Sequence, residues 1–84
     1  MTSDDLLRMS AELGENLARH RAAYGDLWPE VSKPAANEIR RLMAEQKTEN
    51  PLKVALSIAD RLIKNEVDPS FVLAVATDQK QFKQ

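Results

Sequence analysis

The chain has 84 residues, of which 43% are hydrophobic, 2 are glycine and 4 are proline. Its length excludes a second domain, and so small a share of turn-forming residues excludes a many-stranded β fold. The apolar content is too high for a disordered segment. We therefore expect a single all-α domain over residues 1–84.

The charges nearly balance, with 12 Lys and Arg against 13 Asp and Glu and a net charge of −1. A molecule with this balance has no overall field that would hold it to nucleic acid or to an anionic membrane. The absence of cysteine excludes disulfide frameworks and thiolate metal sites. Because the first residues are acidic and no apolar run reaches the roughly 18 residues of a membrane helix, we expect a cytoplasmic protein with no membrane segment.

The first predicted helix runs from Ser3, whose hydroxyl can cap free backbone amides, to about Tyr24, where Gly25 can end it without steric strain. Its apolar residues form two adjoining ridges. The first ridge contains Leu6, Met9, Leu13, Leu17 and Tyr24, and the second contains Leu7, Ala11, Gly14, Ala18 and Ala22. Glycine is unfavourable within a helix, so Gly14 predicts the close approach of another backbone. Apolar surface on two ridges also predicts a symmetric homodimer.

The segment after Gly25 is predicted to be an irregular, partly packed loop over residues 26–33, because Pro29 biases Trp28 away from the α-helical region. Pro34 suits the first position of a second helix, which we expect to end near Lys47. The apolar stripe of this helix consists of Ala35, Ala36, Ile39, Leu42 and Met43.

A third helix is predicted over residues 51–65, because Asn50 is a good capping residue and Pro51 is preorganised for a first helical position. Apolar residues cover more than half of its circumference and leave one polar strip. That strip consists of Lys53, Ser57, Asp60, Arg61 and Lys64. The wide apolar surface predicts that this third helix lies at the centre of the fold.

Asp68 and Pro69 repeat the cap-and-proline signal and start a fourth element, which is predicted from Ser70 to about Gln79. Its apolar run from Phe71 to Ala76 is also compatible with a buried strand. We favour a helix, because the cap is good and no second strand is available for pairing. Residues 80–84 are polar apart from Phe82 and are expected to fray. The whole pattern predicts a small bundle of about four helices with short connections.

The sequence offers no motif for catalysis or for binding a metal ion or cofactor. His20 is the only histidine and stands between Arg19 and Arg21, whose charges oppose a bound cation. The two glycines are far apart, so no phosphate-binding loop is present. The serines and threonines lie in no recognisable nucleophile motif. We therefore expect no enzymatic activity, no metal and no cofactor, and we interpret His20 as a residue at the edge of the core.

Two groups of residues are candidates for binding a partner. Tyr24, Leu27 and Trp28 concentrate the chain's only tyrosine and only tryptophan in one segment, and aromatic residues often anchor interfaces. The alternative interpretation is that Trp28 closes one end of the bundle as a core residue. The second group contains Arg40 and Arg41.

Folding could join Arg40 and Arg41 to Arg61 and Lys64 in a basic patch for nucleic acid or an acidic protein surface. Glu38 and Glu45 flank the two adjacent arginines and dilute their charge. A solvated surface is therefore the alternative interpretation of these residues.

The resulting functional hypothesis is a non-enzymatic protein-interaction module. In this hypothesis the protein is a small adaptor or inhibitor that binds a larger intracellular protein. The candidate contact residues are Tyr24, Leu27, Trp28, Arg40 and Arg41. The alternatives are a nucleic-acid-associated regulator that uses Arg40, Arg41, Arg61 and Lys64, and a structural subunit of a homo-oligomer.

Overall fold

The computed structural model describes residues 3–82 and contains only helices and connecting turns within that range. The all-α fold class is confirmed. The elements are α1 (Ser3–Ser10), α2 (Leu13–Tyr24), η1 (Gly25–Leu27), α3 (Trp28–Gln46), α4 (Pro51–Ser57), α5 (Ala59–Lys64), α6 (Pro69–Thr77) and η2 (Gln79–Gln81), where η marks a single 3₁₀ turn. None of the described helices combines the length and the apolar character needed to cross a membrane.

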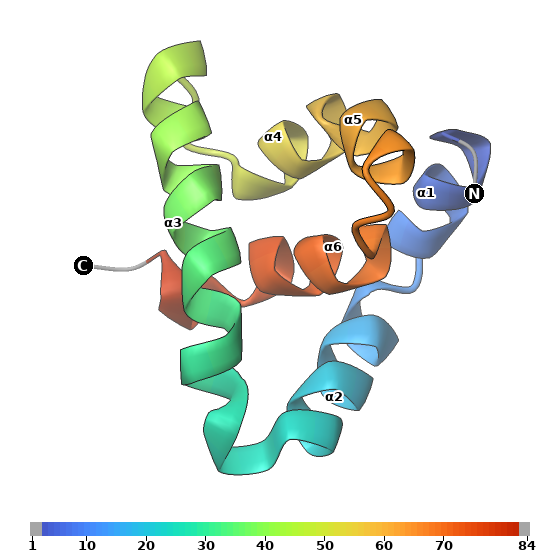
Figure 1. Ribbon diagram of the computed structural model, residues 1–84, viewed down its shortest axis with the longest axis vertical. Coiled ribbons are helices and arrows are strands. Elements are labelled where there is room, and N and C mark those ends of the chain that lie inside the picture. The colour runs from blue at the N-terminus through green and yellow to red at the C-terminus, as the bar shows by residue number, and fades with distance from the viewer. Residues whose placement is uncertain (1–2, 83–84) are drawn as a thin grey trace.

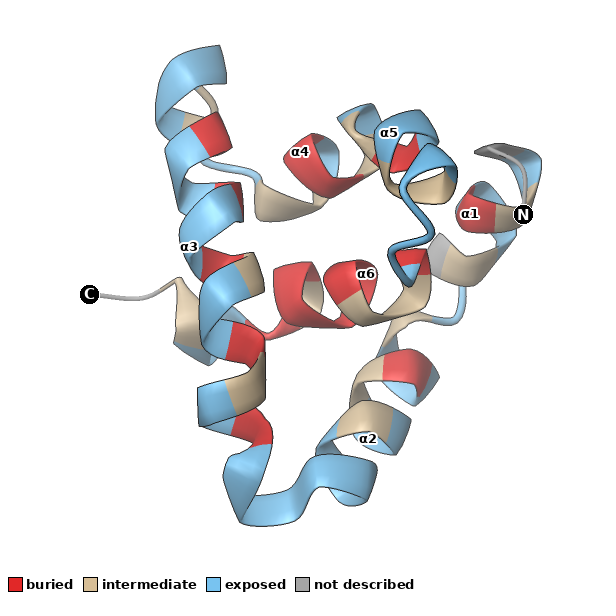
Figure 2. Ribbon diagram, in the orientation of Figure 1, coloured by how far each residue is buried: buried red, intermediate tan, exposed pale blue. Residues whose placement is uncertain are grey.

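Helix α6 lies at the centre of the fold (Figure 1), with α4 and α5 on one side, α2 on the other and α3 across one end. It contacts each of the helices α1 to α5, and it is the most completely buried helix in Figure 2. Its buried residues are Pro69, Val72, Leu73, Ala74, Val75 and Ala76. The run from Phe71 to Ala76 is therefore a helix and not a strand.

The prediction that residues 51–65 form the central helix is wrong, because α6 takes that place. A helix that is apolar on all sides must be surrounded to remove its surface from water. The segment 51–65 keeps a polar strip, and its Lys53, Asp60, Arg61 and Lys64 are exposed. This segment therefore covers α6 on one side only.

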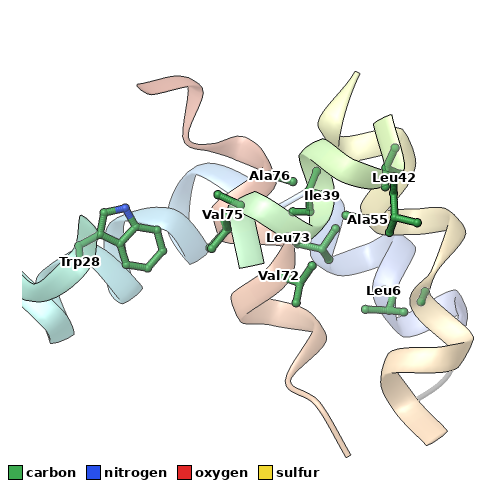
Figure 3. Close-up of a cluster of buried hydrophobic side chains, with 13 residues drawn as sticks. Leu6, Trp28, Ile39, Leu42, Ala55, Val72, Leu73, Val75 and Ala76 are labelled. Carbon is green, nitrogen blue, oxygen red and sulfur yellow. The ribbon is translucent and has the colours of Figure 1, made fainter. Parts of the chain in front are cut away.

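The core is one cluster of buried side chains to which every α-helix except α2 contributes, and α2 adds Leu13 and Leu17 from its edge. Figure 3 shows Ile39 from α3 and Leu73 from α6 in the middle of this cluster, and Trp28 at one end. Phe82, expected in a frayed end, packs against the core after the helical turn η2. Of the predicted frayed residues, 83–84 lie outside the described part of the chain.

Two of the predicted helices are each divided by a short break. The first is interrupted at Ala11 and Glu12, and the buried Asn16 donates from its side chain to the Met9 carbonyl across this break at 3.4 Å. The third is interrupted at Ile58, which has φ −100° and ψ 7°. Each break divides one helix into two short ones, and α1, α2, α4 and α5 all contact α6.

The predicted close approach of a backbone at Gly14 is wrong. Gly14 is exposed, and a Cβ atom at this position would meet no atom within 4 Å. The whole second ridge is exposed as well, and it consists of Leu7, Ala11, Gly14, Ala18 and Ala22. Leu6, Met9, Leu13 and Leu17 of the first ridge lie in or against the core, whereas Tyr24 is exposed. Within the described chain, only the first of the two ridges is therefore buried, and not along its whole length.

The predicted loop over residues 26–33 is also wrong beyond Leu27, because α3 already begins at Trp28 and contains Pro34 in its interior. Pro29 lies in the first turn of α3, where its missing N–H leaves no helical hydrogen bond unmade. The buried Ser32 hydroxyl donates to the Trp28 carbonyl at 2.6 Å and accepts from Gln81 Nε2 at 2.7 Å. The tertiary bond between Ser32 and Gln81, together with the burial of Trp28 and Ser32, outweighs the local bias of the two prolines.

Three helix ends, at Gly25, Asn50 and Asp68, lie where the sequence predicted them. Gly25 ends α2 with φ +56°, a backbone conformation that favours glycine. Asn50 Oδ1 accepts hydrogen bonds from the backbone amides of Leu52 at 3.1 Å and Lys53 at 3.4 Å. Asp68 Oδ1 accepts from the Ser70 amide at 2.9 Å. The caps before α4 and α6 are therefore confirmed in position and in chemistry.

We expect Asn50→Ala to lower the free energy of unfolding by about 1 kcal/mol, because it removes the acceptor for two free amides at the start of α4. Asn65→Ala is the matched control, since Asn65 follows α5 without a capping role for its side chain, and it should change stability by less than about 0.5 kcal/mol. Urea denaturation followed by circular dichroism measures both values. Equal effects of the two variants would contradict the role assigned to the cap.

Candidate functional site

The chain's only tryptophan and only tyrosine lie in an aromatic cluster where α2, α3 and α6 meet. The centroid of the Trp28 ring is 5.6 Å from that of Phe71 and 6.2 Å from that of Tyr24. Phe71 meets Trp28 at an interplanar angle of 67° and Tyr24 at 74°. Edge-to-face geometry of this kind is favourable for aromatic pairs. The cluster therefore attaches the junction of α2 and α3 to α6.

Trp28 closes this end of the core, as the alternative interpretation of the sequence predicted. Its side chain is 4% exposed, and its indole Nε1 donates to Asp78 Oδ2 at 2.6 Å. Asp78 is itself buried, and its Oδ1 accepts from the Lys80 amide at 3.2 Å. The indole is therefore not available as an anchor for a partner, and Trp28 leaves the set of candidate contact residues.

The sequence analysis missed Asp78. The local signal was present, because an aspartate before a short helical turn is a common cap. Its bond to Trp28 joins residues 50 positions apart, and no local pattern indicates such a pair. Only the packing of α3 beside η2 and α6 brings the two side chains together.

Tyr24 and Leu27 remain on the surface, and we refer to this pair as the tip. Tyr24 ends α2 and Leu27 ends η1, and this turn between α2 and α3 lies at one extreme of the molecule (Figure 1). The Leu27 side chain is 61% exposed and that of Tyr24 is 39% exposed. Residues 21–27, which lead into and form the turn, are all exposed (Figure 2). The tip is thus an apolar surface feature supported from below by the aromatic cluster.

His20 lies at the edge of the core, as predicted. Its Nε2 is 3.3 Å from Ser70 Oγ, and its ring stacks on Trp28 with a centroid distance of 6.4 Å. The ring also meets the edge of Phe71 at 5.6 Å. Within residues 3–82, no three His, Asp or Glu side chains are grouped so that they could hold a metal ion. His20 therefore contributes packing and one polar contact to the aromatic cluster.

The four basic residues proposed for nucleic acid lie in different surroundings. Arg40 donates to Asn37 Oδ1 at 3.1 Å, and its guanidinium carbon lies 5.5 Å from the centre of the Phe82 ring. Arg41 instead bonds Glu38 at 2.5 Å and Glu45 at 3.1 Å. Its two neighbouring carboxylates offset its charge.

Arg61 and Lys64 are exposed on α5, and Arg61 lines a surface hollow together with Glu38. The hydrogen bond from Arg41 lowers the pKa of the Glu38 carboxyl below its usual value, and the charge of Arg61 lowers it further. Glu38 therefore stays ionised near neutral pH and lies between two of the arginines. The positive charge of this region is interrupted by a carboxylate.

A mainly apolar groove that the sequence analysis did not predict runs between α3 and α5. It consists of two adjoining hollows of about 280 Å³ and 110 Å³ that share Glu38, Ile58 and Leu62. The larger hollow is also lined by Pro34, Ala35, Ile39, Val67 and Val72. The smaller is also lined by Leu42, Arg61 and Asn65. We call this feature the α3–α5 groove.

The groove was missed because its lining residues come from three separate segments of the sequence. The one local sign was Val67, an apolar residue in the connection between α5 and α6 that is 42% exposed. A valine in a loop is compatible with many roles. Its place beside Ile58 and Leu62 follows only from the fold.

No family model matches the chain, and no curated protein or solved structure is significantly similar to it.

We expect Asp78→Ala to lower the free energy of unfolding by about 2 to 3 kcal/mol, because it leaves the buried Trp28 N–H without an acceptor and removes the cap of η2. In a Trp28→Phe background the same change should be less destabilising by about 1 to 2 kcal/mol. Urea denaturation followed by circular dichroism is the measurement, since Trp28→Phe removes the only tryptophan fluorescence.

Asp26→Ala is the matched control, because Asp26 is an exposed aspartate in η1, and it should change stability by less than about 0.5 kcal/mol. Strictly additive effects of Trp28→Phe and Asp78→Ala would show that the bond between the two side chains contributes nothing to stability.

Proposed function

We propose that this protein is a non-enzymatic protein-interaction module, an adaptor or inhibitor that presents the tip to a larger protein. The observation that carries the proposal is the 61% exposure of Leu27 next in the chain to the buried Trp28, whose ring packs against that of Tyr24. A large apolar side chain in water is unfavourable, and its burial at an interface contributes to affinity. At the tip, an exposed apolar side chain stands next to an aromatic side chain that is already packed against Trp28 and Phe71.

The aromatic contacts of Tyr24 favour binding, because they already restrict a side chain whose conformational freedom association would otherwise remove. Tyr24 already contacts the rings of Trp28 and Phe71, so its side chain is ordered before a partner arrives. Leu27 stands between the last turn of α2 and the first turn of α3. Preorganised contact residues lose less conformational entropy on binding.

The surroundings of the tip resemble the usual anatomy of an interface. Arg21, Asp26 and Glu30 are exposed close by in the chain, and interfaces commonly place a polar rim around an apolar centre. Arg40 lies 12 residues beyond Trp28 on the same helix, roughly 18 Å away at 1.5 Å per residue. We therefore assign the proposed contact to Tyr24 and Leu27, without Arg40 and Arg41.

We expect Leu27→Asp to abolish retention of the partner by the tagged protein in cell extract, because it places a charge at the centre of the proposed contact. Leu7→Asp is the control, since Leu7 is a 57% exposed leucine on α1, and it should retain the partner. Thermal melting by circular dichroism should give both variants the stability of the parent protein. Retention of the same partner by Leu27→Asp would contradict the proposal.

The same extract experiment separates the two alternative functions. Recovery of nucleic acid that is released at high salt would favour a regulator that uses Arg40, Arg41, Arg61 and Lys64. A purified protein that has the mass of an oligomer and retains nothing would favour a structural subunit.

A further inference from the structure

We propose that the α3–α5 groove is a second binding site, and that its occupant is an amphipathic helix of a partner protein with basic residues along one flank and acidic residues along the other. The site is separate from the tip, and the proposal does not depend on the function assigned to Tyr24 and Leu27.

The shape of the groove suits a helix. Its α3 wall extends from Pro34 to Leu42, a distance of about 12 Å or two helical turns. Its other wall includes Ile58, Leu62 and Asn65 at successive turns. A helix laid between two helical walls places side chains of spacing i, i+4 and i+7 into such a groove. The described residues contain no sheet edge to which an extended peptide could add a strand.

The chemistry of the floor favours aliphatic side chains over a small metabolite. Ile39, Ile58 and Val72 line the larger hollow, and they offer no hydrogen-bonding side chain that could orient a polar ligand. Leucine or isoleucine side chains from a helix need only apolar contact and would remove Val67 from water.

The two walls of the groove carry opposite charge. On α3 the charged residue that lines the groove is Glu38. Arg41 bonds Glu38 at 2.5 Å and Glu45 at 3.1 Å, so the row of charges that continues from Glu38 along α3 contains two carboxylates and one guanidinium. On the other wall Arg61 is exposed and forms no salt bridge within residues 3–82. A ligand with one basic and one acidic flank therefore complements both walls at once.

The test uses three designed helical peptides, each held in helical form by a hydrocarbon staple and each with the same leucine stripe. The mixed peptide has lysine on one flank and glutamate on the other, and the two control peptides have lysine on both flanks or glutamate on both. This comparison does not depend on the direction in which the helix lies, because reversing the helix only exchanges its flanks. Fluorescence anisotropy measures affinity, and methyl NMR of Ile39 and Ile58 reports the position of binding.

We expect the parent protein to bind the mixed peptide about tenfold more tightly than either control at low salt, with methyl shifts at Ile39 and Ile58. Arg61→Glu makes both walls acidic and should reverse the order, so that the double-lysine peptide binds most tightly. Val67→Asp should weaken every peptide by about tenfold or more, because it places a charge in the apolar lining. Leu27→Asp is the matched control and should leave all three affinities unchanged.

Three outcomes would overturn the proposal. The first is the absence of methyl shifts at Ile39 and Ile58 with every peptide. The second is an order of affinities that Arg61→Glu leaves unchanged. The third is binding that Leu27→Asp abolishes and Val67→Asp preserves, which would assign the peptides to the tip.

Discussion

The burial of α6 is the constraint on which the rest of the structure depends. This helix has apolar side chains on every side, and Val72, Leu73, Ala74, Val75 and Ala76 are all buried. Each fully buried large apolar side chain contributes about 1.5 to 3 kcal/mol, so the stable arrangement surrounds α6 completely. The breaks at residues 11–12 and 58 each divide one predicted helix into two, and all four of the resulting helices contact α6.

The contact between Trp28 and Asp78 extends the core beyond the end of α6. Asp78 follows the last residue of α6 directly, and its bond to the indole holds the start of α3 beside this end of the helix. Ser32 and Gln81 make a second link between α3 and η2. Because α2 and α3 are joined by the single turn η1, these links also determine where Tyr24 and Leu27 stand on the surface.

Helix α3 connects the two proposed binding surfaces. Its buried stripe consists of Trp28, Ser32, Ala36, Ile39 and Leu42. Its first residue follows the tip, and its middle forms one wall of the α3–α5 groove. The exposed apolar side chains of Leu27 and Val67 thus belong to two separate surfaces. The two proposed contacts therefore do not overlap.

The sequence by itself determined the helical class and the ends of the helices at Gly25, Asn50 and Asp68. These features depend on hydrogen bonds and backbone preferences within about four residues along the chain, so a local pattern contains them. Tertiary structure decided that α6 is central, that α3 begins at Trp28, and that Val67 lines a groove with Ile58 and Leu62. Each of these depends on which apolar surfaces meet, and burial joins residues as distant as Trp28 and Asp78. The free energy of such contacts is a property of the packed molecule, and no short stretch of sequence carries it.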